Sequence, residues 1–317
     1  MSTYYSLAEV PADFGPCAVT IGNFDGVHIG HQHLIGAVVQ KARENGWKAA
    51  VLTFDPHPTR VVAPAKAPKL LSSTEERLVL MREAGVENAL VLPFNDDVRQ
   101  LSPAEFAERI LAQKLQARAV FVGDNFRFGH KQAGDTAMLE ELGKTLGFTV
   151  HVVHGVAFRH RPVSSSVVRT LLNSGEVALA ARMLDRPYSL TGEVVSGHGI
   201  GGKQTVPTLN LRTAAEILPA DGVYVTRTRD LDGGRVWPSI TNIGFRPTFN
   251  GDERTIETYV LEPLAGEAPH HIEVQFLRWI RGERKFADAA ALRQQILRDV
   301  SRAQAFHRRL AKCVLIH

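Results

Sequence analysis

An eleven-residue stretch near the start of the chain, Gly22 to Gln32, constrains the fold more than any other part of the sequence. It reads Gly-Asn-Phe-Asp-Gly-Val-His-Ile-Gly-His-Gln and follows residues 17–21, whose apolar and β-branched side chains predict a buried strand of a parallel sheet. After it, apolar residues recur at helical spacing from Leu34 onward. A strand, a glycine-containing turn and a helix in this order present free backbone N–H groups and the positive end of a helix dipole to an anion. The sequence therefore predicts a phosphate site.

The candidate ligands of this site lie in the turn itself. The binding candidates are Gly22, Asn23, Phe24, Asp25 and Gly26. The glycines permit close backbone approach, and the asparagine and aspartate are expected to bond to amides of the turn. His28 and His31 are expected to lie on one helix face and to donate hydrogen bonds to a phosphate whose charge grows during in-line displacement. The alternative is a solvated loop with two surface histidines, because motifs this short also occur without function.

Strands and helices alternate through the rest of the first half. Expected strands cover 48–54, 88–92, 119–123 and 148–153, and expected helices cover 74–84, 136–146 and a segment that opens at Ser102-Pro103. This alternation predicts a Rossmann-like, doubly wound parallel sheet, whose ligands bind beyond the carboxyl ends of the strands. Three more polar stretches follow expected strands and supply the candidates Phe54, Asp55, Asn125, Ser164 and Arg169. The arginine is placed to reach the β- and γ-phosphates of a nucleotide.

The periodicity changes after a short helix at 176–184 and a linker at 185–188. Six short strands are expected at 190–195, 206–211, 222–228, 236–243, 255–261 and 272–277, followed by one helix. This pattern predicts a small six-stranded β-barrel with a C-terminal helix. The fold class is thus α/β plus all-β, with expected domains at 1–185 and 186–317.

Polar residues in the second half suggest a separate chemistry. Thr208 and Asn210 alternate along a strand, so their oxygens lie on one side, and neutral oxygens beside a nucleotide phosphate suit Mg²⁺. The preceding glycine-rich loop carries Gly199 and Lys203, which are candidates for phosphate contact. Glu257, among apolar neighbours, is a candidate general base for an alcohol nucleophile. A solvent-facing strand carboxylate is the alternative interpretation of that glutamate.

The turn at 22–32 resembles the nucleotide-binding signature of nucleotidyltransferases with an H-x-G-H motif. With N-F-D-G before the histidines, it is similar to the bacterial bifunctional riboflavin kinase/FAD synthetase family. The later stretches, F-D-P-H-P, G-D-N-F-R-F-G and S-S-S-V-V-R, occur in that family's order, and 207–210, 242–249 and Glu257 match its riboflavin kinase module. The resemblance implies two reactions: the second domain phosphorylates riboflavin to FMN with Mg²⁺-ATP. The first then transfers AMP from ATP to FMN, giving FAD and pyrophosphate.

Two alternatives to the bifunctional enzyme remain. In the glycine-rich loop, Ile200, Gly202 and Val206 replace the arginines and phenylalanine usual in the family. The family's acidic turn, which contains a tyrosine, is also missing, and residues 262–271 stand in its place. A FAD synthetase whose barrel binds flavin with little or no kinase activity is therefore one alternative. The other is a class I aminoacyl-tRNA synthetase, which also carries H-I-G-H, although no K-M-S-K-S-like loop or anticodon module is visible.

Charge and cysteine content limit the possible partners of the chain and the cell compartment in which we expect it. The net charge is +4, and the first 185 residues carry equal numbers of basic and acidic residues, so the excess lies in the second half. Its basic segment, 278–312, is interleaved with apolar residues at helical spacing, which favours a solvated helix face over RNA binding. Two cysteines make no disulfide framework, and no apolar run is long enough for a signal peptide or a membrane span. We expect a cytoplasmic enzyme of small-molecule substrates, with neither nucleic-acid nor membrane partners.

Overall fold

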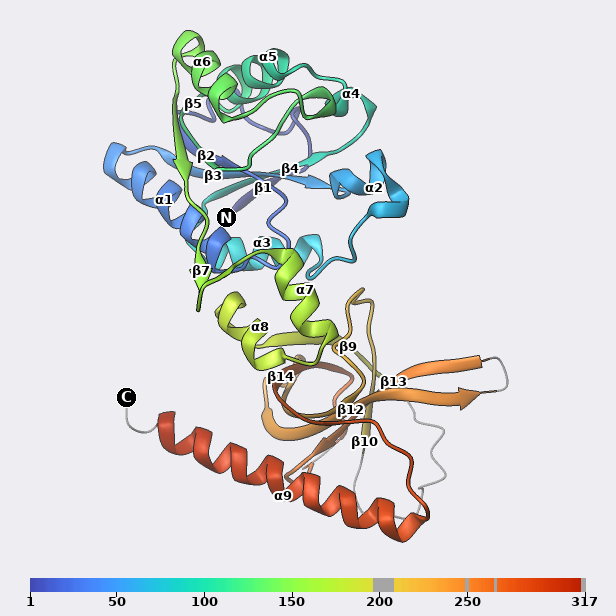
Figure 1. Ribbon diagram of the computed structural model, residues 1–317. Coiled ribbons are helices and arrows are strands. Elements are labelled where there is room, and N and C mark those ends of the chain that lie inside the picture. The colour runs from blue at the N-terminus through green and yellow to red at the C-terminus, as the bar shows by residue number, and fades with distance from the viewer. Residues whose placement is uncertain (196–207, 249–250, 265–266, 315–317) are drawn as a thin grey trace. The chain divides into compact units, whose positions relative to one another are not determined.

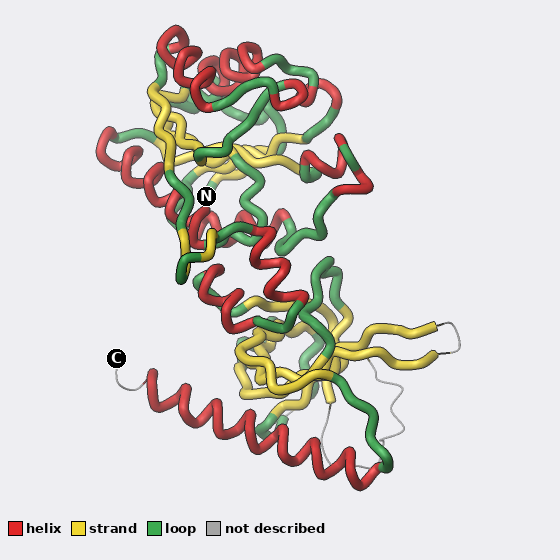
Figure 2. The backbone as a smooth tube through the Cα atoms, viewed as in Figure 1, coloured by secondary structure: helices red, strands yellow, loops and turns green. Residues whose placement is uncertain are grey.

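The computed structural model describes residues 1–195, 208–248, 251–264 and 267–314, with the backbone alone at 246–248, 251–253 and 313–314. Its contacts divide the chain into two units, Met1–Ser165 and Ser166–His317. Figures 1 and 2 show an α/β unit in the first half and a barrel with a long helix in the second.

The first unit is built on a six-stranded parallel sheet. Its strands are β1 (Ser2–Tyr4), β2 (Cys17–Ile21), β3 (Lys48–Asp55), β4 (Asn88–Pro93), β5 (Ala117–Gly123) and β6 (Thr149–Val153), in the order β1-β4-β3-β2-β5-β6. The predicted doubly wound sheet is thereby confirmed. The edge strand β1 was not expected, because three residues are too short to show a periodic pattern. The strand order reverses between β2 and β5, and ligands of such sheets bind at this crevice.

Helices cover both faces of this sheet (Figure 1). The main helical segments are α1 (Ile29–Asn45), α3 (Thr74–Glu83), the π-helical segment η2 (Phe106–Lys114) and α6 (Thr136–Leu146); short ones are α2 (Pro58–Val62), η1 (Pro64–Lys66), α4 (Asp96–Arg99), α5 (Pro103–Glu105) and η3 (His130–Gln132). One apolar cluster joins the sheet to η2 and α6, and a second joins it to α1 and α3. A capping box between Ser73 and Glu76 starts α3, so Ser73 is the N-cap and Thr74 is already helical. A small hairpin, β7 (Ala157–Phe158) and β8 (Arg161–Pro162), precedes the end of the unit.

The second unit is a closed antiparallel barrel with helices outside it. Two helices, α7 (Ser165–Asn173) and α8 (Val177–Leu184), precede strands β9 (Tyr188–Val195), β10 (Thr208–Arg212), β11 (Gly222–Asp230), β12 (Val236–Thr248), β13 (Gly251–Val260) and β14 (His271–Gly282), and α9 (Ala289–Val314) ends the chain. The barrel closes in the order β10-β13-β12-β11-β14-β9, which confirms the predicted six-stranded barrel and C-terminal helix. Helix α9 packs on it through Ala303, which is fully buried against Val223, Val225 and Ile240.

The contacts place the division between the units earlier than the expected domain limits. Helix α8 packs against β14 and β9, and its residues Val177, Ala180 and Met183 are fully buried. The limits 1–185 and 186–317 assigned α7 and α8 to the first domain, whereas the contacts group both helices with the barrel. Which segment folds by itself stays a prediction.

The barrel interior contains a line of buried hydroxyl groups, here termed the hydroxyl chain. It runs through Thr228, Ser239, Thr226, Thr241 and Thr258, each 0% exposed. Successive oxygens are 2.8, 2.8, 2.8 and 2.9 Å apart. Because β11, β12 and β13 each contribute to it, the chain of hydrogen bonds links three neighbouring strands.

Among the residues that the structure describes, we find no helix with the length and apolarity that crossing a bilayer requires.

Candidate functional site

The two histidines of the glycine-containing turn form a stacked pair. Their ring centroids are 3.6 Å apart and the ring planes differ by 14°. His28 is the N-cap of α1 rather than part of its first turn: its Nδ1 accepts a hydrogen bond from the backbone N–H of His31 at 3.2 Å. Since Nδ1 is an acceptor there, the proton of the neutral His28 ring lies on Nε2, which is a donor. The prediction that the pair lies together at the helix start is confirmed.

His31 is held as a neutral imidazole with an unused polar atom. Burial lowers its pKa well below the usual 6.5, and the neighbouring His28 lowers that pKa further. Among the described residues, its buried Nδ1 has no hydrogen-bond partner. Phe24, itself 1% exposed, packs edge-on against the His31 ring at 5.2 Å. A buried polar atom without a partner is costly in a folded chain, so its presence here points to a ligand that completes it.

Two positions of the turn, Gly26 and Gly22, require glycine for different geometric reasons. Gly26 has φ of 77°, in the left-handed region that a residue with a side chain rarely adopts. A Cβ at Gly22 would lie 3.1 Å from the ring of Phe24. The glycine therefore leaves room for the phenylalanine that supports His31, and Phe24 is a packing residue of the site.

Asp25 ties the turn to a distant loop. It is 2% exposed, and its Oδ1 accepts hydrogen bonds from the backbone N–H groups of Leu71 at 2.9 Å and Ser72 at 3.2 Å. The Ser72 hydroxyl in turn accepts from the backbone N–H of Gly26 at 2.9 Å. The expectation of bonding within the turn missed these partners, which lie 46 and 47 residues away in the sequence. Asp25 is thus placed to hold the shape of the turn.

A buried arginine beneath the turn was not among the sequence candidates. Arg77 of α3 is 2% exposed; its Nη1 donates to the carbonyl oxygen of Asn23 at 2.6 Å and to Thr53 Oγ1 at 3.3 Å, and Nη2 donates to Thr74 Oγ1 at 2.7 Å. Burial lowers its pKa, while the carboxylate of Asp25 acts in the opposite direction. A guanidinium keeps its proton in proteins, so this is a fixed positive charge under the expected phosphate site. An arginine at an ordinary helix position carries no sequence signal for this role.

Other candidates lie at the ends of neighbouring strands. Asn125 is exposed and lies two residues after the end of β5, the strand beside β2, while exposed Asp55 ends β3 on the other side. Phe54 is half-buried against Phe94, with ring centroids 5.5 Å apart. Since β3, β2 and β5 are parallel neighbours, their carboxyl ends meet at one edge of the sheet.

The serine triplet contacts the same turn. Ser165 Oγ donates to the carbonyl oxygen of Asp25 at 3.0 Å, and Ser164, which is half-buried, precedes it. Arg169 lies in α7, half-buried, and belongs to the second unit. The structure therefore brings Ser165 to the turn, and its contacts group the arginine with the second unit.

On the barrel, the candidate base lies between two amides. Asn210 of β10 and Asn242 of β12 are both directly opposite Glu257 of β13. Cross-strand partners project to the same face with Cβ atoms about 4.5–5.5 Å apart. On β13, Ile256 and Thr258 are buried while Glu257 is half-buried, so this face is the outside of the barrel. We call these three residues the amide–carboxylate row. Asn242 was not a sequence candidate, because strand register is not visible in a sequence.

The remaining barrel candidates are two possible metal ligands and two loop residues. Thr208 is exposed on the same face of β10 as Asn210, while Leu209 between them is buried. These neutral oxygens fit a hard cation that keeps waters and shares phosphate oxygens. Within the described part of the chain, no group of three His, Cys, Asp or Glu side chains is arranged to hold a metal ion. Gly199 and Lys203 lie outside the described residues.

Comparisons with known proteins cover nearly the whole chain. The family models described as FAD synthetase and riboflavin kinase match residues 10–167 and 184–307. A Pseudomonas fluorescens protein named bifunctional riboflavin kinase/FMN adenylyltransferase is 37% identical over 91% of this chain and 92% of its own length. Proteins of the same name from Haemophilus influenzae and Escherichia coli K12 are 33% and 32% identical, over 92% and 95% of this chain and 94% and 96% of their own lengths.

A solved structure shares the fold. The crystal structure titled as a macrolide-efflux protein from Streptococcus pneumoniae superposes with a TM-score of 0.85, covering 95% of this chain and 98% of that one. Its sequence is 24% identical, so the similarity establishes a common fold alone.

Proposed function

The chain belongs to the family of bifunctional riboflavin kinases/FMN adenylyltransferases, and from that premise we propose how its residues divide the two reactions. The barrel phosphorylates riboflavin with ATP to give FMN. The first unit then adenylylates FMN with ATP to give FAD. The family supplies the reactions, and the two sites supply the assignment of residues.

The adenylyl transfer rests on the histidine pair. The phosphate oxygen of FMN attacks the α-phosphorus of ATP, and the bond to the departing pyrophosphate breaks. His28 donates from Nε2 and His31 from its ring to the phosphate oxygens, where negative charge accumulates in the transition state. Both rings act as neutral donors, since burial disfavours protonation of His31. The single observation that carries this proposal is the buried, partnerless Nδ1 of His31 beside the N-cap of α1.

The other residues of the first site bind the substrates or hold the turn in its shape. The proposed nucleotide and flavin contacts are Gly22, Asn23, Gly26, Phe54, Asp55, Asn125 and Ser164, and a contact of Arg169 with the nucleotide phosphates is proposed from sequence alone. Phe24 and Asp25 keep the turn in its shape through the contacts described above. Arg77 adds a fixed positive charge below the turn, which favours bound phosphate.

In the kinase reaction, Glu257 is the proposed general base. It takes the proton from the terminal ribityl hydroxyl as that oxygen attacks the γ-phosphorus of ATP. Asn210 and Asn242 flank it and restrict its orientation. Thr208 and Asn210 would hold Mg²⁺, which neutralises phosphate charge when bound. Contacts of Gly199 and Lys203 with the phosphates are proposed from sequence alone.

We also propose a cytoplasmic location. Cys17 is a free thiol buried in β2, and burial raises its pKa to about 12. A buried, unreactive thiol suits a reducing compartment, where disulfides are rare.

The test is to incubate the purified chain with riboflavin and Mg²⁺-ATP and to separate FMN and FAD by chromatography. FMN should appear first and FAD should follow, and chelation of Mg²⁺ should stop phosphorylation. FAD formed from added FMN, with no FMN formed from riboflavin, would replace the proposal by a FAD synthetase with a flavin-binding barrel.

A further inference from the structure

A basic concavity lies beside α9 on the barrel, away from the amide–carboxylate row. It has a volume of about 340 Å³. Arg278 of β14 and Arg302 and Arg309 of α9 line it together with Phe306, Ile280 and Trp279. Residues 302, 306 and 309 share one face of the helix because of their spacing. We call this concavity the arginine pocket.

The three arginines are not neutralised by neighbouring carboxylates. None of the ion pairs among the described residues includes Arg278, Arg302 or Arg309. None of the described aspartates and glutamates lines the pocket. Three like charges around one concavity repel one another, and low-dielectric walls focus their potential inside it. The pocket therefore favours an anion of more than one negative charge.

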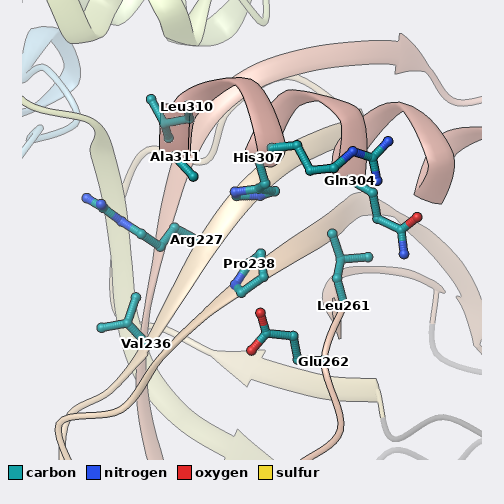
Figure 3. Close-up of a pocket in the computed structure, with 10 residues that line it drawn as sticks. Arg227, Val236, Pro238, Leu261, Glu262, Gln304, His307, Leu310 and Ala311 are labelled. Atoms are coloured by element: carbon teal, nitrogen blue, oxygen red, sulfur yellow. The ribbon is translucent and has the colours of Figure 1, made fainter. Parts of the chain in front are cut away.

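A larger cavity on the other side of α9 shows the contrast. It has a volume of about 750 Å³, and Figure 3 shows Pro238 and Leu261 on its strand side and His307 on the helix. Two arginines, Arg227 and Arg308, and one carboxylate, Glu262, line it, so its net positive charge is smaller than that of the arginine pocket. Its walls are mostly apolar.

The pocket is also separate from the proposed kinase chemistry. Arg278 is opposite Val225 in the pairing of β14 with β11, whereas the amide–carboxylate row occupies β10, β13 and β12. Phe306 is half-buried at the pocket and packs with the apolar cluster under α9. Trp279 also lines the pocket and is 44% exposed, although its indole lies beside Gly175 and Gly222. An apolar surface thus adjoins the three positive charges.

We propose that the arginine pocket binds a small ligand with two or more linked phosphate groups. Guanidinium groups match phosphate oxygens in geometry and charge, and three of them balance a pyrophosphate group. An attached apolar or aromatic part lies on Phe306, which lines the pocket. The volume suits a small molecule, since ligand pockets span about 300–1,000 Å³. Free pyrophosphate and a nucleoside diphosphate share this chemistry.

The test uses the fluorescence of Trp279 in the full chain. Inorganic pyrophosphate and ADP are titrated separately, without Mg²⁺, into the parent and into Trp279→Phe, and the difference isolates the signal of this one indole at the edge of the pocket. The double substitution Arg302→Glu/Arg309→Glu should lower the affinity for the probes, measured from this fluorescence change, at least tenfold. Arg293→Glu/Arg298→Glu is the matched control, because it changes charge equally at exposed positions of α9 that do not line the pocket. Circular dichroism and thermal unfolding verify that all variants are folded.

The two probes separate the possible sources. Tighter binding of ADP assigns the site to nucleotides, and equal binding assigns it to the diphosphate group itself. An unchanged response in the pocket variant, or equal weakening in the control, overturns the proposal. The proposal is also overturned if the parent shows no response to either probe but binds an RNA oligonucleotide through these arginines. Catalysis is not part of the readout, so the result is independent of the function proposed above.

Discussion

The two proposed reaction sites are built in opposite ways. In the first unit the histidine turn is buried and is held by contacts between residues far apart in the sequence, such as Arg77 with Asn23, 54 positions away. On the barrel, Asn210, Glu257 and Asn242 lie side by side on the outer face because of strand register. The first site thus depends on tertiary packing around it, whereas the second depends on the backbone ladder.

This difference sets which substitutions matter. In the turn, Asp25 shapes the site through its hydrogen bonds to the loop at 71–72. On the barrel, a change of one outward side chain leaves the ladder intact. Chemistry and stability are therefore coupled in the first unit and separable in the second.

Glu257→Gln tests most directly whether chemistry and stability are separable on the barrel. The barrel should stay folded, while the rate of riboflavin phosphorylation falls by roughly 10²-fold to 10⁴-fold because the base is lost. Adenylyl transfer from ATP to FMN should stay at the parent rate. Two assays on one variant measure this, and an unchanged rate of FMN formation would make Glu257 an ordinary surface carboxylate.

His31→Ala should impair adenylyl transfer and spare the kinase reaction, and His28→Ala should have the same effect. FAD formation should fall by about 10²-fold to 10³-fold, as when one preorganised donor is removed. Riboflavin phosphorylation should be nearly intact. His33→Ala is the control, because His33 is an exposed histidine of the same helix. A doubly substituted His28/His31 variant that makes FAD at the parent rate would contradict the assignment.

A pair of fragments tests how far the barrel extends. Fragment 166–317 should have a free energy of unfolding at least about 3 kcal/mol above that of 186–317, because the shorter one exposes the surface that Val177, Met183 and Leu184 cover. Urea unfolding followed by circular dichroism gives both values. Equal stabilities would support the limit at residue 185 and would make α8 an accessory of the first unit.

The pH dependence of stability tests the burial of His31. Its pKa is lowered in the folded chain, so below the usual 6.5 the unfolded chain binds a proton that the folded chain does not. Stability should therefore fall as pH decreases below about 6.5, with a slope up to about 1.4 kcal/mol per pH unit steeper in the parent than in His31→Gln. His151 and His307 also have lowered pKa values, but both variants retain them. Equal slopes in urea unfolding at pH 5 to 7 would show that His31 is accessible to protons.

The sequence predicted most of the fold. Period-two and helical patterns identified the strands, and Gly22 to Gln32 located the turn, because these signals are local. The partners of the turn were missed: Arg77 and Ser72 are ordinary residues until the chain folds and brings them under it.

The same limit applies on the barrel and at the unit boundary. Alternation predicted that Thr208 and Asn210 share a face, but only the register of β12 with β13 reveals Asn242 beside Glu257. Helix α8 was assigned to the preceding domain because its pattern shows an apolar face without showing what covers it. Pairings between distant segments are set by the whole energy of packing, which no window of sequence contains.

The hydroxyl chain inside the barrel has a consequence for how this sequence changes over evolutionary time. Each of its hydroxyl groups has one proton and two neighbouring oxygens at most, so replacing Thr241 by valine leaves both Thr226 and Thr258 without one bond. An unsatisfied buried hydroxyl costs about 1–3 kcal/mol, whereas replacing bonded partners together is nearly neutral. Substitutions on β11, β12 and β13 are therefore tied to one another: a lineage passes from a hydroxyl to a methyl interior by paired steps, and single steps are selected against.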